Sequence, residues 1–239
     1  MKTVKPTKKH ARKIVELLSH GLVSGLGRPE PGQMCVEAAV CYALGLPHDD
    51  DPKCVGNAVR SAKIQLNDSG WSSNIARANG MQRIAVAQLG SNEIDQVAFA
   101  QTLAESTIKV IIPMALRSAA SVCKDKHKEA LLSAATKCEI EGSEGAARAA
   151  SDAASDAASY AARAASYAAS YAAGAAGAAR DAARAASAAS YAASAASYAA
   201  GAASDASDAV LIVMAKNIEQ ALIEHKSPGV KWLDICNPS

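Results

Sequence analysis

Large apolar side chains are scarce in this chain of 239 residues, although half of its residues count as hydrophobic. Aromatic residues make up only 4%, and Phe99 is the single phenylalanine. The longest strongly apolar runs, Val110–Leu116 and Val210–Ala215, fall far short of the roughly 20 residues that cross a bilayer. No membrane association is therefore predicted. Because no secretory signal pattern opens the sequence either, we expect a cytoplasmic protein.

An excess of charge is also lacking. The net charge is only +2, whereas a nucleic-acid binder needs clustered Lys and Arg to neutralise phosphates, so binding to nucleic acid is not expected. The cysteines contain no CxxC pair, which favours reduced and mostly buried thiols. No run alternates apolar and polar residues as a strand does, and the pattern predicts an all-α fold.

An alanine-rich tract from Gly145 to Asp208 dominates the second half of the chain and contains no proline. Alanine is the best helix former, so the tract is predicted to be helical. Alanine pairs recur with a mean step of about 3.7 residues up to Ala172, close to an eleven-residue repeat, and of about 3.3 beyond it. Two architectures fit within a helical bundle: one long rod, or a hairpin that bends near Gly174 and Gly177.

Alanine faces let helices pack closely, and exposed alanine stripes favour self-association into a homo-oligomer. Tyrosines recur along the tract at spacings of seven and four residues, which places them on common helical sides. They are either edges of an internal seam or contacts to a protein partner: Tyr160, Tyr167, Tyr171, Tyr191 and Tyr198. Ice binding is a second hypothesis for an alanine-rich repeat, although this tract has no threonine and carries bulky tyrosines.

The sequence predicts a helical domain at 1–141 and an alanine-rich region with a C-terminal anchor at 142–239. Glycine and proline positions delimit the expected helices. They span 8–20, 33–45, 52–66, 71–89 and 91–112, then 114–139 after Pro113, and 210–225 after the tract. Asp51 and Pro52 are the expected start of the third helix. Trp71 is expected to pack over the end of that helix, and Trp232, Leu233 and Ile235 to dock on the core.

Unusual residues concentrate between Gly21 and Asp68. Cys35 and Cys54 fall near predicted helix starts, where the helix dipole lowers a thiol pKa. Two chemical hypotheses follow besides a purely structural role. One pairs Cys35 as a nucleophile with His48 or His20. The other is a metal site, formed by Cys35, His48, Asp51 and Cys54.

The glycine-rich loop GLVSGLGRPEPG, from Gly21 to Gly32, offers backbone N–H groups before a helix. Such loops bind phosphate, which suggests a small-ligand or nucleotide site. Its lining would comprise Gly25, Gly27, Arg28, Cys35 and His48. The loop has no Walker sequence and follows no strand, and simple chain reversal explains it equally.

The segment from Gly32 to Asp68 resembles a motif of uncharacterised bacterial and phage helical proteins. The motif combines a Cys-bearing helix, an Asp-x-Pro-x-Cys turn and a Leu-Asn-Asp helix end. The matching residues are Cys35, Glu37, Asp50, Pro52, Cys54, Asn67 and Asp68. The alanine tract resembles putative immunity proteins of bacterial conflict systems. Together the resemblances imply a helical core and a non-enzymatic binding or inhibitor protein, of the immunity or anti-defence kind, that acts through a protein partner. No particular cofactor is implied.

Overall fold

The computed structural model describes residues 4–122, 125–143, 145–150 and 204–236. Within these ranges the chain is all-α, apart from one isolated β-bridge between Gly27 and Met34. No helix in the described part combines the length and apolar character needed to cross a bilayer. The predicted fold class is therefore confirmed.

Short helices make up the first half of the chain. They are α1 (Lys8–Leu18), α2 (Val36–Ala43), α3 (Asn57–Asn67), α4 (Asn74–Ala87) and the 3-10 turn η1 (Ser91–Glu93). After them come α5 (Gln96–Ser106), the π-helical segment η2 (Thr107–Ile111), α6 (Ile112–Val122), α7 (Asp125–Glu141), α11 (Ser204–Glu224) and the 3-10 segment η3 (Pro228–Ile235).

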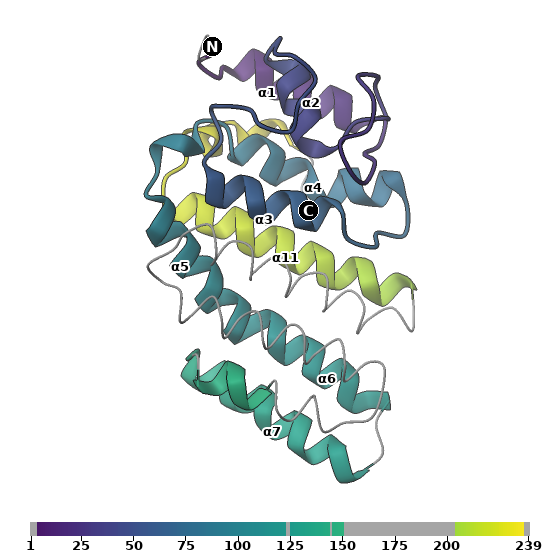
Figure 1. Ribbon diagram of the computed structural model, residues 1–239, viewed down its shortest axis with the longest axis vertical. Helices are drawn as coiled ribbons and strands as arrows, with labels where there is room; N and C mark the ends of the chain where they lie inside the picture. The colour runs from purple at the N-terminus through teal and green to yellow at the C-terminus, as the bar shows by residue number, and fades with distance from the viewer. Residues whose placement is uncertain (1–3, 123–124, 144, 151–203, 237–239) are drawn as a thin grey trace.

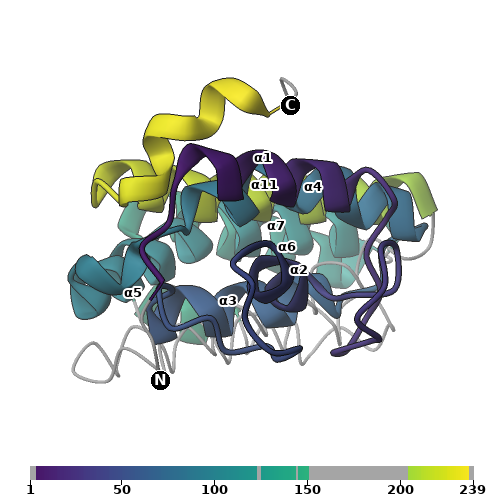
Figure 2. The ribbon, with the colours of Figure 1, turned by 90° about the horizontal axis from the view of Figure 1, so that it is seen from above.

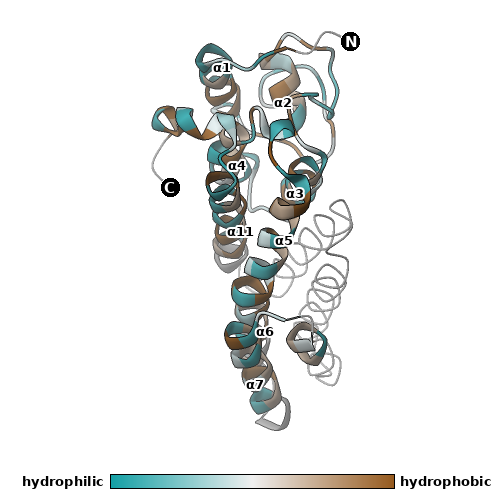
Figure 3. Cartoon of the chain, turned by 90° about the vertical axis from the view of Figure 1, so that its left-hand side faces the viewer, coloured by the Kyte–Doolittle hydropathy of each residue, from teal (hydrophilic) through white to brown (hydrophobic). Residues whose placement is uncertain are grey.

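Helices α1, α4, α11, α6 and α7 follow one another from top to bottom of Figure 1. Helix α4 packs against both α1 and α11, and α11 also packs against α3 and α5. Figure 3 shows α2, α3 and α5 beside this row. One hydrophobic core joins these elements, so it continues across the predicted boundary at residue 142.

The start of α3 differs from the prediction. Pro52 and Cys54 lie in a turn closed by the Val55 N–H donating to the Pro52 carbonyl at 2.8 Å, and the helix begins only at Asn57. Two side chains from later in the chain satisfy the backbone here. Ser91 Oγ accepts from Gly56 N at 3.0 Å, and Gln96 Oε1 accepts from Ala58 N at 3.2 Å. Tertiary contacts therefore replace the expected Asp51 cap.

The segment around Pro113 also differs. Helix α5 begins at Gln96 and not at residue 91, because Asp95 caps it by accepting from Val97 N and Ala98 N. The expected new helix after Pro113 begins one residue before it, at Ile112, directly after the π-helical segment η2. Proline lacks an N–H and its ring collides with the carbonyl of the fourth preceding residue, and a wider turn relieves both problems.

The single helix predicted from 114 to 139 is wrong. Helices α6 and α7 lie side by side, and Arg117 Nη2 reaches Glu139 Oε2 at 2.6 Å (Figure 1). The two helices bury apolar residues such as Leu116 and Leu131 completely. Turning the chain back lets these apolar faces meet, which one straight helix would not allow.

Both described ends of the alanine tract are helical: residues 145–150, and Ser204–Asp208 within α11. Ala146, Ala147 and Ala150 are fully buried, and Cys138 Sγ on α7 donates to the Ala146 carbonyl. Small methyl groups thus allow the close packing expected of them. Residues 151–203, which include Gly174, Gly177 and the five tyrosines, lie outside the described residues, so the choice between rod and hairpin stays a prediction.

The C-terminal segment docks on the core as predicted. Trp232 is buried, and η3 packs against α1 and α4 (Figure 2). Ser227 Oγ donates to the Ala87 carbonyl at 2.6 Å, which ties the end of α11 to the end of α4.

Candidate functional site

A polar cluster lies inside the core beneath the glycine-rich loop. Glu37 on α2 and Lys63 on α3 form an ion pair of 2.5 Å, and both side chains are completely buried. Burial raises the pKa of Glu37 and lowers that of Lys63, since each charged form loses its hydration. Their mutual attraction opposes both shifts. The fully buried amide of Gln88, at the end of α4, faces the same carboxylate.

Buried thiols surround this pair. Burial raises the pKa of Cys35 to about 11 and that of Cys41 to about 12, and it also raises the pKa of Cys54. Cys35 is the N-cap of α2, and its sulfur accepts from Ala38 N at 3.4 Å. That contact favours the thiolate, but the loss of hydration outweighs it. The expected activation of Cys35 by the helix start is therefore not found.

The predicted nucleophile and metal partners are engaged elsewhere. His48 Nε2 lies 3.2 Å from the Gly27 carbonyl, and the Asp51 carboxylate pairs with Lys53. Among the residues that the structure describes, no three His, Cys, Asp or Glu side chains gather in a group that could hold a metal ion. The proposed set of Cys35, His48, Asp51 and Cys54 does not form such a group.

The glycine-rich loop uses its backbone donors internally. Gly25 N donates to Asp68 Oδ1 at 2.7 Å, and Arg28 N donates to the Gln33 carbonyl at 2.6 Å. A carboxylate of the chain itself therefore occupies the place where a phosphate was expected. Gly27 sits at a φ of +71°, and a Cβ there would overlap the backbone of Gln33. The close approach of these two backbone segments accounts for glycine at position 27, and no ligand is needed to explain it.

Gly25 and Cys35 share a cavity of about 40 Å³ that Asp50, Asn67 and Asp68 also line. A single water occupies about 30 Å³ in the liquid, and small-molecule sites span about 300–1,000 Å³. The cavity is too small for a nucleotide in this conformation.

The polar residues of the resemblance motif hold neighbouring segments together. Asn67 accepts from Val36 N at 3.2 Å and donates to the Val23 carbonyl at 2.9 Å. Arg60 donates to both the carbonyl and the carboxylate of Asp50, at 2.5 Å each. These contacts fix the two loops onto α2 and α3, which is a structural role.

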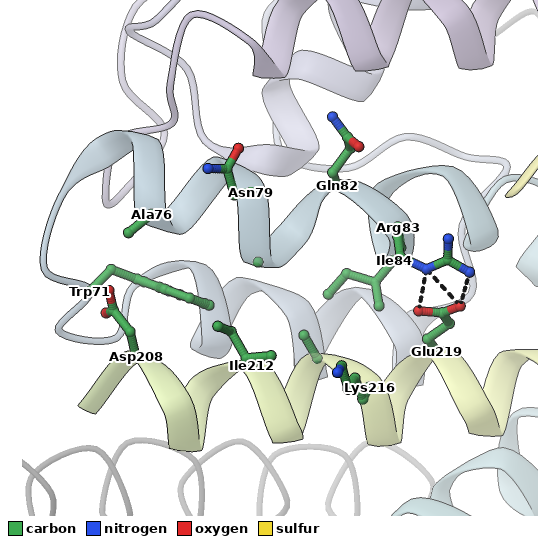
Figure 4. A pocket seen from close by; sticks show the side chains of 12 residues that line it. Trp71, Ala76, Asn79, Gln82, Arg83, Ile84, Asp208, Ile212, Lys216 and Glu219 are labelled. Atoms are coloured by element: carbon green, nitrogen blue, oxygen red, sulfur yellow. Dashed lines mark hydrogen bonds and ion pairs between the residues drawn. The ribbon is translucent and has the colours of Figure 1, made fainter. Parts of the chain in front are cut away.

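A larger depression lies on the other side of the core. A groove of about 480 Å³ runs between α4 and α11 (Figure 4). Trp71 lies at one end, where its indole N–H donates to the Leu66 carbonyl at 2.9 Å and confirms the predicted helix joint. Gly80 lies under its ring, where a Cβ would overlap the indole. Ile212 lies between the two ends of the groove.

Polar contacts close both ends of this groove. Asp208 on α11 accepts from Ser72 N at 2.9 Å and from the Ser72 hydroxyl. At the other end, the Arg83 guanidinium binds both carboxylate oxygens of Glu219, with Nε at 3.0 and 2.9 Å and Nη2 at 2.6 Å. Both contacts join residues 136 positions apart, so α4 and α11 run parallel.

The sequence did not predict this groove. Its two walls are distant in the chain, and nothing in the sequence pairs the residues of one wall with those of the other. No family model, curated protein or solved structure matches this chain.

Proposed function

We propose that this protein is a non-enzymatic helical binding protein, and that the α4–α11 groove receives a helix of a partner protein. The groove is the observation that carries the proposal. It spans from Asp208 to Glu219, a separation of eleven residues or about 16 Å of helix. That length matches three turns of a bound helix, a recurrent mode of recognition.

The groove is preorganised for binding. Contacts at both ends fix α4 against α11, so little conformational entropy would be lost when a partner docks. Its lining combines the apolar side chains of Trp71, Ile84 and Ile212 with the small residues Ala76 and Ala215. Ile212 is 37% exposed within it, which offers an apolar contact to a partner side chain.

The resemblances point to a biological class for this binding. The alanine tract resembles putative immunity proteins of bacterial conflict systems, which supports an immunity or anti-defence role. The Cys-helix motif resembles uncharacterised bacterial and phage proteins and supports only the shared helical core. The raised pKa values of the buried thiols support a role without covalent catalysis.

Site-specific photo-crosslinking tests the proposal. A benzophenone amino acid is placed at Ile212 in the groove, or at Ile140 on α7 as a control with 75% exposure. Irradiation of cells that make the protein should give a discrete adduct with a partner from position 212 and none from position 140. The purified partner should then bind Ile212→Glu more weakly than Ile140→Glu. Equal binding by the two variants contradicts the proposal.

The tyrosines of the alanine tract are a second predicted partner surface. Replacing Tyr160, Tyr167 and Tyr171 with alanine is expected to weaken capture of the same partner while the helical circular dichroism signal stays unchanged. Unchanged capture would leave the groove as the one proposed contact surface.

A further inference from the structure

We propose that the helix received by this groove is α11 of a second copy of the chain, so that the free protein forms an antiparallel homodimer. The inference rests on the proposed use of the groove in helix binding and names its occupant. It follows from the arrangement of charge on the exposed side of α11.

Asp208, Ile212 and Lys216 line the groove at intervals of four residues. Residues four apart share a helical face, so an acid, an apolar residue and a base stand in one row. Ile212 is partly exposed at the centre of the row. Lys216 is exposed, and no carboxylate in the described part of the chain lies within ion-pair distance of its ammonium.

This row is complementary to itself. A two-fold axis through Ile212 places Lys216 of one copy opposite Asp208 of the other, twice, with the two isoleucines in contact. Closed dimers use such self-complementary patches. A parallel arrangement would instead put Asp208 against Asp208 and Lys216 against Lys216. Charge therefore selects both the antiparallel direction and the register.

The surroundings of the row permit close approach. Ala76 on α4 and Ala215 on α11 present only methyl groups to an incoming helix, and the flat Trp71 ring covers Gly80. Arg83 and Glu219 neutralise each other at the far end, which leaves the row as the charged feature. The Asp208 carboxylate already accepts two hydrogen bonds from Ser72 and has capacity for a further donor.

Charge reversal provides the test with the full chain. Sedimentation equilibrium of the wild type should show a monomer–dimer equilibrium. Lys216→Glu places two acids opposite each other, and Asp208→Lys places two bases, so each variant alone should dimerise about tenfold or more weakly. A mixture of the two restores opposite charges at both contacts. The mixture should therefore form a heterodimer of near wild-type affinity, seen by labelling one variant with a fluorophore.

Two further variants complete the design. Lys9→Glu on α1 makes the same charge change away from the groove and should dimerise like the wild type. Ile212→Glu brings two acids together on the axis and should abolish the dimer even if Asp208→Lys fails to fold. Circular dichroism establishes that each variant is folded.

A monomeric wild type at all accessible concentrations overturns the homodimer. So does a dimer that both charge reversals leave intact, or variants that fail to recover on mixing. In each case the crosslinking of a different protein at position 212 would still support the groove as a docking site, so the two proposals fail separately.

Discussion

At the scale of single residues, Glu37 and Lys63 form an ion pair that is completely buried in the core. Neither side chain is exposed to solvent, and neither carboxylate oxygen of Glu37 makes a well-aligned hydrogen bond within the described residues. Burying two charges with so few additional hydrogen bonds costs more than their attraction returns. The pair therefore contributes to the specificity of helix packing more than to stability.

Substitution separates these contributions. Glu37→Gln leaves Lys63 buried without its counter-charge and should lower the free energy of unfolding by about 3–5 kcal/mol. The double substitution Glu37→Met with Lys63→Met removes both charges at similar volume, and should be neutral or stabilising by about 1–4 kcal/mol. Urea denaturation followed by circular dichroism measures both. A double variant that loses as much stability as Glu37→Gln would contradict this account.

The thiols of Cys35 and Cys41 should be unreactive in the folded protein. Burial raises the pKa of Cys35 from an ordinary value of 9.0 to about 11, which lowers the thiolate fraction at neutral pH roughly 100-fold. Alkylation by iodoacetamide, followed per residue by mass spectrometry, should be correspondingly slow and should accelerate in urea. Faster reaction of Cys35 in the native protein than of a free thiol would restore the nucleophile hypothesis.

The same shift has a consequence for stability at alkaline pH. The folded-state pKa of Cys35 lies above the unfolded value, so the folded protein retains its proton where the unfolded chain loses it. The stability from this thiol is complete below pH 9 and is lost as the pH rises to about 11. Cys35→Ala should flatten this part of a plot of unfolding free energy against pH.

At the scale of elements, the sequence predicts helix existence better than helix ends. Ends with a local signal were placed within a few residues, as at the start of α4, where Ser73 caps the backbone N–H of Ala76. The start of α3 depends instead on Ser91 and Gln96, which are more than thirty residues away. The reversal between α6 and α7 also depends on the burial of two faces against each other. Local patterns do not encode such contacts.

The candidate sites show the same limit of sequence-based prediction. The sequence singled out Cys35, Asp50, Asn67 and Asp68. The structure brings these residues together, and their polar groups bond to other residues of the chain and not to a ligand. The α4–α11 groove was missed because it exists only when residues 136 positions apart meet. A pattern confined to one segment carries no information about such a pair.

Gly80 allows α4 to form one wall of that groove. Alanine would improve helix propensity by about 1 kcal/mol, but its Cβ would overlap the Trp71 ring. Gly80→Ala should therefore destabilise the protein by about 1–3 kcal/mol through overpacking, and tryptophan fluorescence should shift as the ring moves. Gly70→Ala is the matched control, since a Cβ there meets no atom within 4 Å. A Gly80→Ala variant at least as stable as Gly70→Ala would contradict this account, because overpacking would then cost no more than the gain in helix propensity.

At the scale of the whole molecule, the C-terminal segment η3 packs on α1, the first helix of the chain, and on α4 (Figure 2). Trp232 is buried in this contact, and Lys8 Nζ lies 2.6 Å from the Asp234 carboxylate. The side chains of this ion pair are 43% and 59% exposed, and water screens it. The apolar contact should therefore provide nearly all the stability of this closure.

Two substitutions in this closure should differ sharply in their effect on stability. Trp232→Ala removes a buried aromatic side chain and should lower the free energy of unfolding by about 3–5 kcal/mol. Lys8→Ala removes only a solvent-exposed ion pair and should change it by less than about 1 kcal/mol. Urea denaturation measures both, and hydrogen exchange should show α1 and α4 losing protection in Trp232→Ala alone. Similar losses in the two variants would mean that the ion pair, and not the indole, holds the C-terminal segment on the core.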